Sequence, residues 1–119
     1  MAHVLVVDDS PQVRRLVQLT LISRGHQVRE AADGYEAWKM MLAERPDLVI
    51  MDVMMPGPSG LDVSRAMRDD ARLVGLPIII LTADGLTAQE QAVSAGAHGF
   101  MVKPFSPSAL CDLVASLLQ

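Results

Sequence analysis

Acidic, hydroxyl and amino side chains end the apolar runs of this 119-residue chain. The residues that follow these runs are Asp8, Asp9, Asp52, Thr82 and Lys103. Adjacent carboxylates repel one another unless a cation offsets the repulsion. Three carboxylates, a hydroxyl and an ammonium group at one edge of a fold would make a site for a divalent cation and an anion. Mg²⁺ suits such a site because it prefers oxygen ligands and keeps water for a phosphoryl group.

Each of these residues alone has an ordinary structural explanation. Aspartate is common in turns and at helix starts, a threonine can cap a helix, and a lysine is usually solvated. The joint occurrence favours a functional site, because Lys103 is one of only two lysines in the chain and Lys39 is the other.

The elements that must position these residues alternate along the chain. Apolar runs predict strands at 3–7, 27–31, 48–51, 78–81 and 99–102. Helical patterns are predicted from Ser10 and Pro11 to Gly25, at 34–44, at 61–70, from the capping box of Thr87 and Glu90 to Gly96, and from Ser106 and Pro107 nearly to Gln119. This alternation predicts one α/β domain over residues 1–119, with a parallel sheet covered on both faces. In such folds ligands bind beyond the carboxyl ends of the strands.

Two of the predicted helices have informative apolar patterns. In the first helix we expect a buried stripe of Val13, Leu16, Val17, Leu19 and Thr20. The segment 108–119 lacks basic residues and contains Leu110, Leu113, Val114, Leu117 and Leu118. This is more apolar surface than one buried stripe requires, so we expect part of it to be exposed and to contact a hydrophobic partner. The alternative is a helix that packs tightly or continues into a linker.

Composition argues against several classes of protein. A net charge of -4 and a pI near 5.2 disfavour direct binding to nucleic acid, which needs clustered basic residues. The chain has no signal peptide pattern and no apolar stretch of membrane-spanning length. The single cysteine, Cys111, suggests a reducing compartment. We therefore expect a cytoplasmic protein without membrane association.

The sequence resembles the receiver domain of two-component response regulators over its whole length. The matching segments are "VLVVDDS", "DLVIMDVMMPGPSGLDV", "PIIILTADG" and "GFMVKPF". The resemblance implies a flavodoxin-like fold with strand order 2-1-3-4-5. It also implies a phosphoacceptor that takes a phosphoryl group from a histidine kinase or histidine phosphotransfer protein and passes the signal to a downstream effector protein or domain.

The resemblance also assigns roles to the polar residues. Asp52 is the expected phosphoacceptor, Asp8 and Asp9 help to hold Mg²⁺, Thr82 contacts the phosphoryl group and Lys103 pairs with it. A carboxylate can attack phosphorus and form an aspartyl phosphate. We expect Asp9 and Asp52 to hold Mg²⁺, with Asp8 bound directly or through water and the backbone carbonyl of Met54 as a further ligand.

A signal must also reach an output surface. In the family, a threonine at the position of Thr82 moves toward the phosphoryl oxygens, and an aromatic residue three positions before the lysine changes its burial. That residue is Phe100 here, which lacks the hydroxyl of the commoner tyrosine and could equally be a core residue. The expected output face combines the fourth helix, the fifth strand and the fifth helix.

Two other classes of protein fit the sequence less well than a receiver does. An acid-nucleophile phosphatase usually has Asp-x-Asp at the nucleophile, whereas Asp52 is followed by Val53 and Met54. A phosphorylation-independent interaction domain of the same fold would not need the five polar residues. We therefore expect a domain that promotes its own phosphorylation and dephosphorylation but is not a turnover enzyme.

Overall fold

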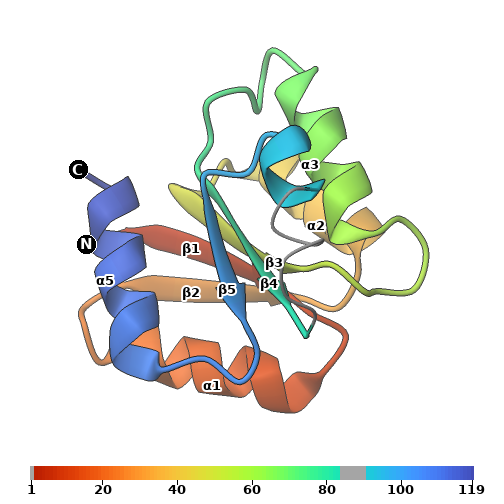
Figure 1. Cartoon of the computed structure of the whole chain (residues 1–119). Coiled ribbons are helices and arrows are strands. Elements are labelled where there is room, and N and C mark those ends of the chain that lie inside the picture. Colours follow the sequence, from red (N-terminus) through yellow and green to blue (C-terminus); the bar gives the residue numbers. More distant parts are fainter. Residues whose placement is uncertain (1, 84–90) are drawn as a thin grey trace.

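The chain folds into a single five-stranded parallel sheet with helices on both faces (Figure 1). This computed structural model describes residues 2–83 and 91–119. The strands lie in the predicted order β2-β1-β3-β4-β5. Their bounds are β1 His3–Val7, β2 Gln27–Ala31, β3 Leu48–Asp52, β4 Ile78–Thr82 and β5 Gly99–Val102. Two strands are one residue longer than predicted, because Asp52 and Thr82 stay in register with the neighbouring strand.

Four helices are defined over their full length. Their bounds are α1 Pro11–Ile22, α2 Gly34–Ala43, α3 Gly60–Arg68 and α5 Pro107–Leu117. Each follows an N-cap side chain that accepts a hydrogen bond from the first turn, namely Ser10, Asp33, Ser59 and Ser106. The predicted capping box of Thr87 and Glu90 lies outside the described residues, and residues 91–94 are helical. None of the described helices has the length and hydropathy needed to cross a lipid bilayer.

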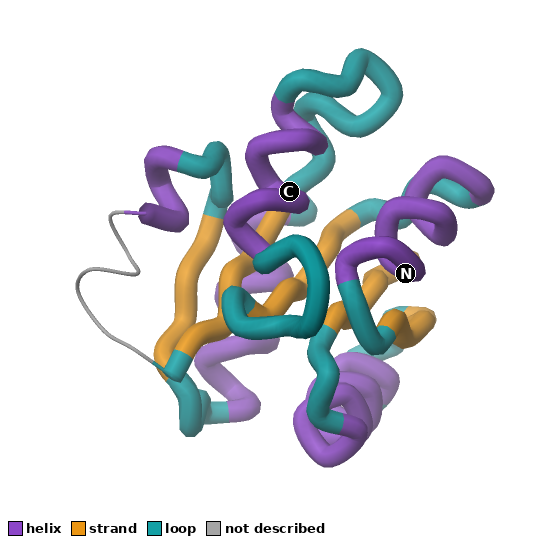
Figure 2. The backbone as a smooth tube through the Cα atoms, turned by 90° about the vertical axis from the view of Figure 1, so that its right-hand side faces the viewer, coloured by secondary structure: helices purple, strands orange, loops and turns teal. Residues whose placement is uncertain are grey.

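The sheet separates two apolar cores, because successive side chains of a strand point to opposite faces. Figure 2 shows helices on both sides of the strands. The core beneath α2 and α3 includes Leu5, Val49, Met51, Ile80, Met41 and Met67. The core beneath α1 and α5 includes Val6, Ile50, Leu81, Val17, Leu21 and Leu110. The central strands β3 and β4 are buried throughout, whereas β5 lies at the edge and pairs only with β4.

Helix α1 buries a narrower face than its sequence pattern predicts. Val17 and Leu21 are fully buried, but Leu16 and Leu19 are 44% and 54% exposed. The prediction that these two leucines belong to the buried stripe was wrong. Helix α5 covers the adjoining part of the same sheet face, so a single line of side chains from α1 completes this core.

Helix α5 is more buried than predicted. Leu110 and Val114 are inaccessible to solvent, while Leu113, Leu117 and Leu118 are partly buried against the same core. The apolar surface that the leucines of 108–119 expose is therefore limited to the partly buried ones, and the expected contact with a hydrophobic partner stays a prediction. The exposed apolar side chains of the neighbouring surface are instead Val93 and Val102, at 68% and 42%.

Candidate functional site

The five predicted polar residues come together at the carboxyl edge of the sheet. Asp8 and Asp9 directly follow β1, Asp52 and Thr82 are the last residues of β3 and β4, and Lys103 follows β5. Strand order reverses here, because β1 lies between β2 and β3. Such a switch point is where doubly wound folds bind ligands.

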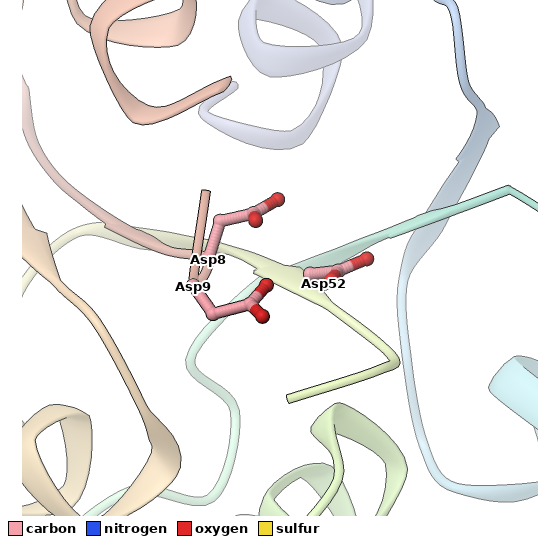
Figure 3. A group of neighbouring side chains, drawn as sticks. All are labelled: Asp8, Asp9 and Asp52. Atoms are coloured by element: carbon pink, nitrogen blue, oxygen red, sulfur yellow. The ribbon is translucent and has the colours of Figure 1, made fainter. Parts of the chain in front are cut away.

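Three carboxylates form an acidic cluster at this edge: Asp8, Asp9 and Asp52 (Figure 3). One carboxylate oxygen of each lies within 4.8 Å of the others. Asp8 and Asp52 are buried, while Asp9 is exposed. Oxygen ligands of one octahedral Mg²⁺ lie about 3 to 4 Å apart, because each is about 2.1 Å from the ion. The acidic cluster therefore has the donor atoms and nearly the spacing that Mg²⁺ requires.

Lys103 bridges two members of the acidic cluster. Its Nζ lies 2.9 Å from Asp8 Oδ2 and 3.1 Å from Asp52 Oδ1. The backbone N–H of Lys103 also donates to the carbonyl of Thr82 at 2.7 Å, which ties the end of β4 to the segment after β5. One ammonium group faces three carboxylates, so the ionised site has a net negative charge that would favour a divalent cation.

Asp8 has protein donors on both carboxylate oxygens. The backbone N–H of Ser10 donates to Oδ1 at 2.9 Å, and Lys103 donates to Oδ2. The backbone N–H of Asp8 donates to the carbonyl of Ala31 on β2. Asp8 is thus fixed by its surroundings, whereas Asp9 projects from the same turn toward solvent.

The charges at the site shift the protonation of its members. Burial raises the pKa of Asp52, and the neighbouring Asp8 carboxylate raises it further, although contact with Lys103 lowers it. Burial lowers the pKa of Lys103, but the hydrogen bonds and charges of Asp8 and Asp52 together outweigh burial and raise it. Lys103 is therefore firmly cationic, while the ionised form of Asp52 is held at a cost in free energy.

The other predicted residues surround this cluster at different depths. Thr82 is buried at the end of β4. Met54 is exposed in the loop after β3. Phe100 is partly buried against the core beneath α2 and α3, and it lines a hollow of about 240 Å³ with Ala92 and Val93. The structure thus places Phe100 between that core and a surface depression.

Sequence reasoning missed Gly60, which fixes how α3 meets the end of β3. Its N–H donates to the carbonyl of Val53 at 2.9 Å, and a Cβ at this position would overlap the backbone oxygen of Asp52. A signal was present: α3, like α2, begins with glycine, whereas α1 and α5 begin with proline. A glycine at a helix start can mark a close approach of two backbones.

The fold and site together define a class of protein, a flavodoxin-like α/β domain with a lysine-bridged acidic cluster at its strand-order switch point. The chain belongs to the response regulator receiver domain family, whose sequence pattern it matches over residues 4–115. It is therefore a receiver domain of the two-component response regulators, as its motifs predicted.

Individual relatives match almost the whole of this chain. It is 33% identical to the phosphate regulon transcriptional regulatory protein PhoB of Pseudomonas aeruginosa, over 98% of this chain and 51% of PhoB. It is 41% identical to response regulator Rre1 of Synechocystis, over 96% of this chain and 50% of Rre1. The chain thus spans about half the length of these regulators. The structure of Vibrio cholerae chemotaxis protein CheY4 matches with a TM-score of 0.93 and 37% identity, over 99% of both chains.

Substituting Gly60→Ala is expected to destabilise the protein, although alanine favours helices. Helix propensity alone would favour alanine, by less than the roughly 1 kcal/mol typical of a helix interior, because Gly60 is the first residue of α3. Overlap with the backbone of Asp52 should instead cost about 1 to 3 kcal/mol, because backbone atoms cannot move aside as a flexible side chain can. Urea unfolding measures the difference, and a variant as stable as the natural protein would show that α3 does not press on Asp52.

Substituting Asp52→Asn is expected to raise the melting temperature at neutral pH in EDTA. The folded protein raises the pKa of Asp52 above the ordinary value of 3.8, so its ionised form opposes folding above that raised pKa. The advantage of the variant should shrink as pH falls, because the natural protein then loses the unfavourable charge. Each kcal/mol corresponds to roughly 4 °C in a domain of this size.

Thermal unfolding from about pH 8 to pH 4 checks this expectation. Asp69→Asn removes an exposed carboxylate and serves as the control. An advantage of Asp52→Asn that grows toward low pH would contradict the electrostatic account.

Proposed function

We propose that Asp52 accepts a phosphoryl group from the phosphohistidine of a histidine kinase or histidine phosphotransfer protein, in a reaction that requires Mg²⁺. The main support is the convergence of three carboxylates on one point, with Lys103 bridging two of them. Such a site neutralises charge and positions groups, which is most of what phosphoryl transfer needs.

The proposed reaction forms one bond and breaks another. A carboxylate oxygen of Asp52 attacks phosphorus while the phosphorus–nitrogen bond of the phosphohistidine breaks. The imidazole leaves with the electron pair of that bond, and Asp52 becomes an aspartyl phosphate. Asp52 lies at the end of a fully buried strand, so the fold holds the attacking oxygen in one place.

The acidic cluster would hold the metal. Mg²⁺, when bound, supplies positive charge that offsets the carboxylates and the phosphoryl oxygens. Asp9 and Asp52 would be direct ligands, and the backbone carbonyl of Met54 would add a third. Asp8 would contribute through water, because protein donors already occupy both of its carboxylate oxygens.

Lys103 and Thr82 would stabilise the phosphorylated form. The amino group of Lys103 already contacts Asp52, so a short movement would bring it onto the phosphoryl oxygens. Thr82 would bring its hydroxyl toward the same oxygens from β4. Phe100 would carry this change to the face made by residues 91–94, β5 and α5, where Val93 and Val102 offer apolar contacts to an effector.

The retained polar residues favour this function over the alternatives. A phosphorylation-independent interaction domain has no use for a buried, lysine-bridged aspartate pair, which is costly to bury. The second acid of an Asp-x-Asp phosphatase motif is absent after Asp52. We therefore propose a phosphoacceptor and not a turnover enzyme.

Helix α1 is the surface that best fits the phosphodonor. It starts two residues after the acidic pair, exposes Leu16, Leu19 and Ile22, and contains basic but no acidic residues. A donor helix with apolar and acidic side chains would complement it. Docking there would place a phosphohistidine beside the acidic cluster.

The primary test is mass spectrometry after incubation with Mg²⁺ and acetyl phosphate. We expect one added phosphoryl group, lost in Asp52→Asn and in EDTA. Lys103→Ala should impair labelling, phosphoryl lifetime or the response to labelling, because it removes the cation nearest the phosphoryl group. Lys39→Ala removes an exposed lysine and is the matched control.

Three outcomes would contradict this proposal. An unlabelled natural protein would favour the interaction domain, and continuous hydrolysis of unrelated phosphomonoesters would favour the phosphatase. If the Lys103→Ala variant matches the natural protein in labelling, phosphoryl lifetime and partner binding, then Lys103 does not have the proposed role.

Leu16→Ser and Leu19→Ser are expected to slow transfer from a phosphorylated histidine protein at least fivefold, about 1 kcal/mol at an interface. Labelling by acetyl phosphate should not change, because a small donor needs no docking surface. Val74→Ser replaces another exposed apolar residue away from α1 and is the control. If both donors slow equally, the leucines act on the site itself and α1 is not the docking surface.

A further inference from the structure

We propose that Arg14 is a positioning residue that orients Asp9 toward the metal, an inference that rests on the proposed function. The Arg14 side chain donates hydrogen bonds to two residues in the described part of the chain. Its Nη1 donates to the backbone oxygen of Asp8 at 2.7 Å, and its Nε donates to Glu30 Oε1 on β2 at 3.2 Å. Only 18% of the side chain is exposed.

The place of Arg14 in α1 explains these contacts. Helical side chains lean toward the N-terminus of their helix, so a residue in the first turn reaches back over the preceding turn. That turn consists of residues 8–10, between β1 and α1. Glu30 anchors the guanidinium on β2, beside β1. Arg14 therefore connects the helix, the turn and the sheet.

The contact with the Asp8 carbonyl affects Asp9 more than Asp8. The Asp8 side chain already has donors from Ser10 and Lys103. The carbonyl held by Arg14, by contrast, belongs to the peptide unit that joins Asp8 to Asp9. Because that unit is planar, fixing its oxygen also fixes the direction in which Asp9 leaves the turn. Asp9 is the exposed member of the acidic cluster, and this peptide unit sets where its side chain begins.

Arg14 could act by positioning Asp9 or only by its positive charge, and these two roles predict opposite effects of its removal on Mg²⁺ binding. The guanidinium is a cation beside a proposed cation site, so as a charge alone it repels Mg²⁺. Its loss would then strengthen Mg²⁺ binding. If Arg14 instead holds the Asp8–Asp9 peptide, its loss frees Asp9 and weakens Mg²⁺ binding. The direction of the change therefore separates the two roles.

The experiment is calorimetric titration of the whole chain with MgCl₂. We expect Arg14→Ala to weaken Mg²⁺ binding about tenfold, the scale of losing a residue that orients a metal ligand. Arg14→Lys keeps the charge but cannot donate to both Asp8 and Glu30 in the same geometry, so it should also bind more weakly. Arg15→Ala removes an exposed arginine from the same turn and should bind Mg²⁺ at least as well as the natural protein.

Folding is checked separately, by circular dichroism and thermal unfolding in EDTA. A folded Arg14→Ala with equal or tighter Mg²⁺ binding would overturn the positioning role. If Arg14→Ala does not fold, Arg14→Lys decides: weaker binding supports the role, and natural affinity overturns it. A natural protein that binds no Mg²⁺ overturns both this inference and the metal site. A natural protein that binds Mg²⁺ but is not phosphorylated overturns the proposed function alone, and the Arg14 comparison still stands.

Discussion

The ion pairs of Lys103 with Asp8 and Asp52 are the interaction on which the rest of the site depends. They join Lys103, which follows β5, to Asp8, which follows β1, and to Asp52, which ends β3. These three residues meet only when β1, β3, β4 and β5 lie side by side in the sheet. Asp8 and Asp52 are buried, so their carboxylates repel and lose hydration, and one ammonium group cannot offset the charge of all three carboxylates. The site is thus assembled with more negative than positive charge, and this imbalance is the electrostatic basis of the proposed metal site.

Much of this arrangement could be predicted from the sequence, because it depends on local patterns. Apolar runs that end in polar residues locate the strands, and in a parallel sheet their carboxyl ends share one edge. Asp8, Asp52 and Lys103 were therefore expected to meet, and they do. The helix starts at Ser10 and Ser106 could also be predicted, because an N-cap hydrogen bond joins residues that are close in the sequence.

What could not be predicted depends on contacts between distant segments. Leu16 looks like a core residue until α5 is seen to cover the same face of the sheet, and the leucines of α5 look exposed for the converse reason. The contact of Gly60 with Asp52 and the reach of Arg14 to Asp8 depend on where a helix starts relative to a strand end. A periodic pattern identifies the apolar side of an element but not how much of that side its neighbours cover.

The edge position of β5 has a mechanical consequence. A strand inside the sheet is held by two hydrogen-bonded ladders, whereas β5, with four residues, is held by one. Displacing β5 therefore disrupts half as many ladders as displacing β3 or β4. Phe100 lies on this strand and Lys103 directly follows it. The lysine is therefore attached to an edge of the sheet, where one ladder resists displacement, whereas two ladders hold β3, which carries Asp52.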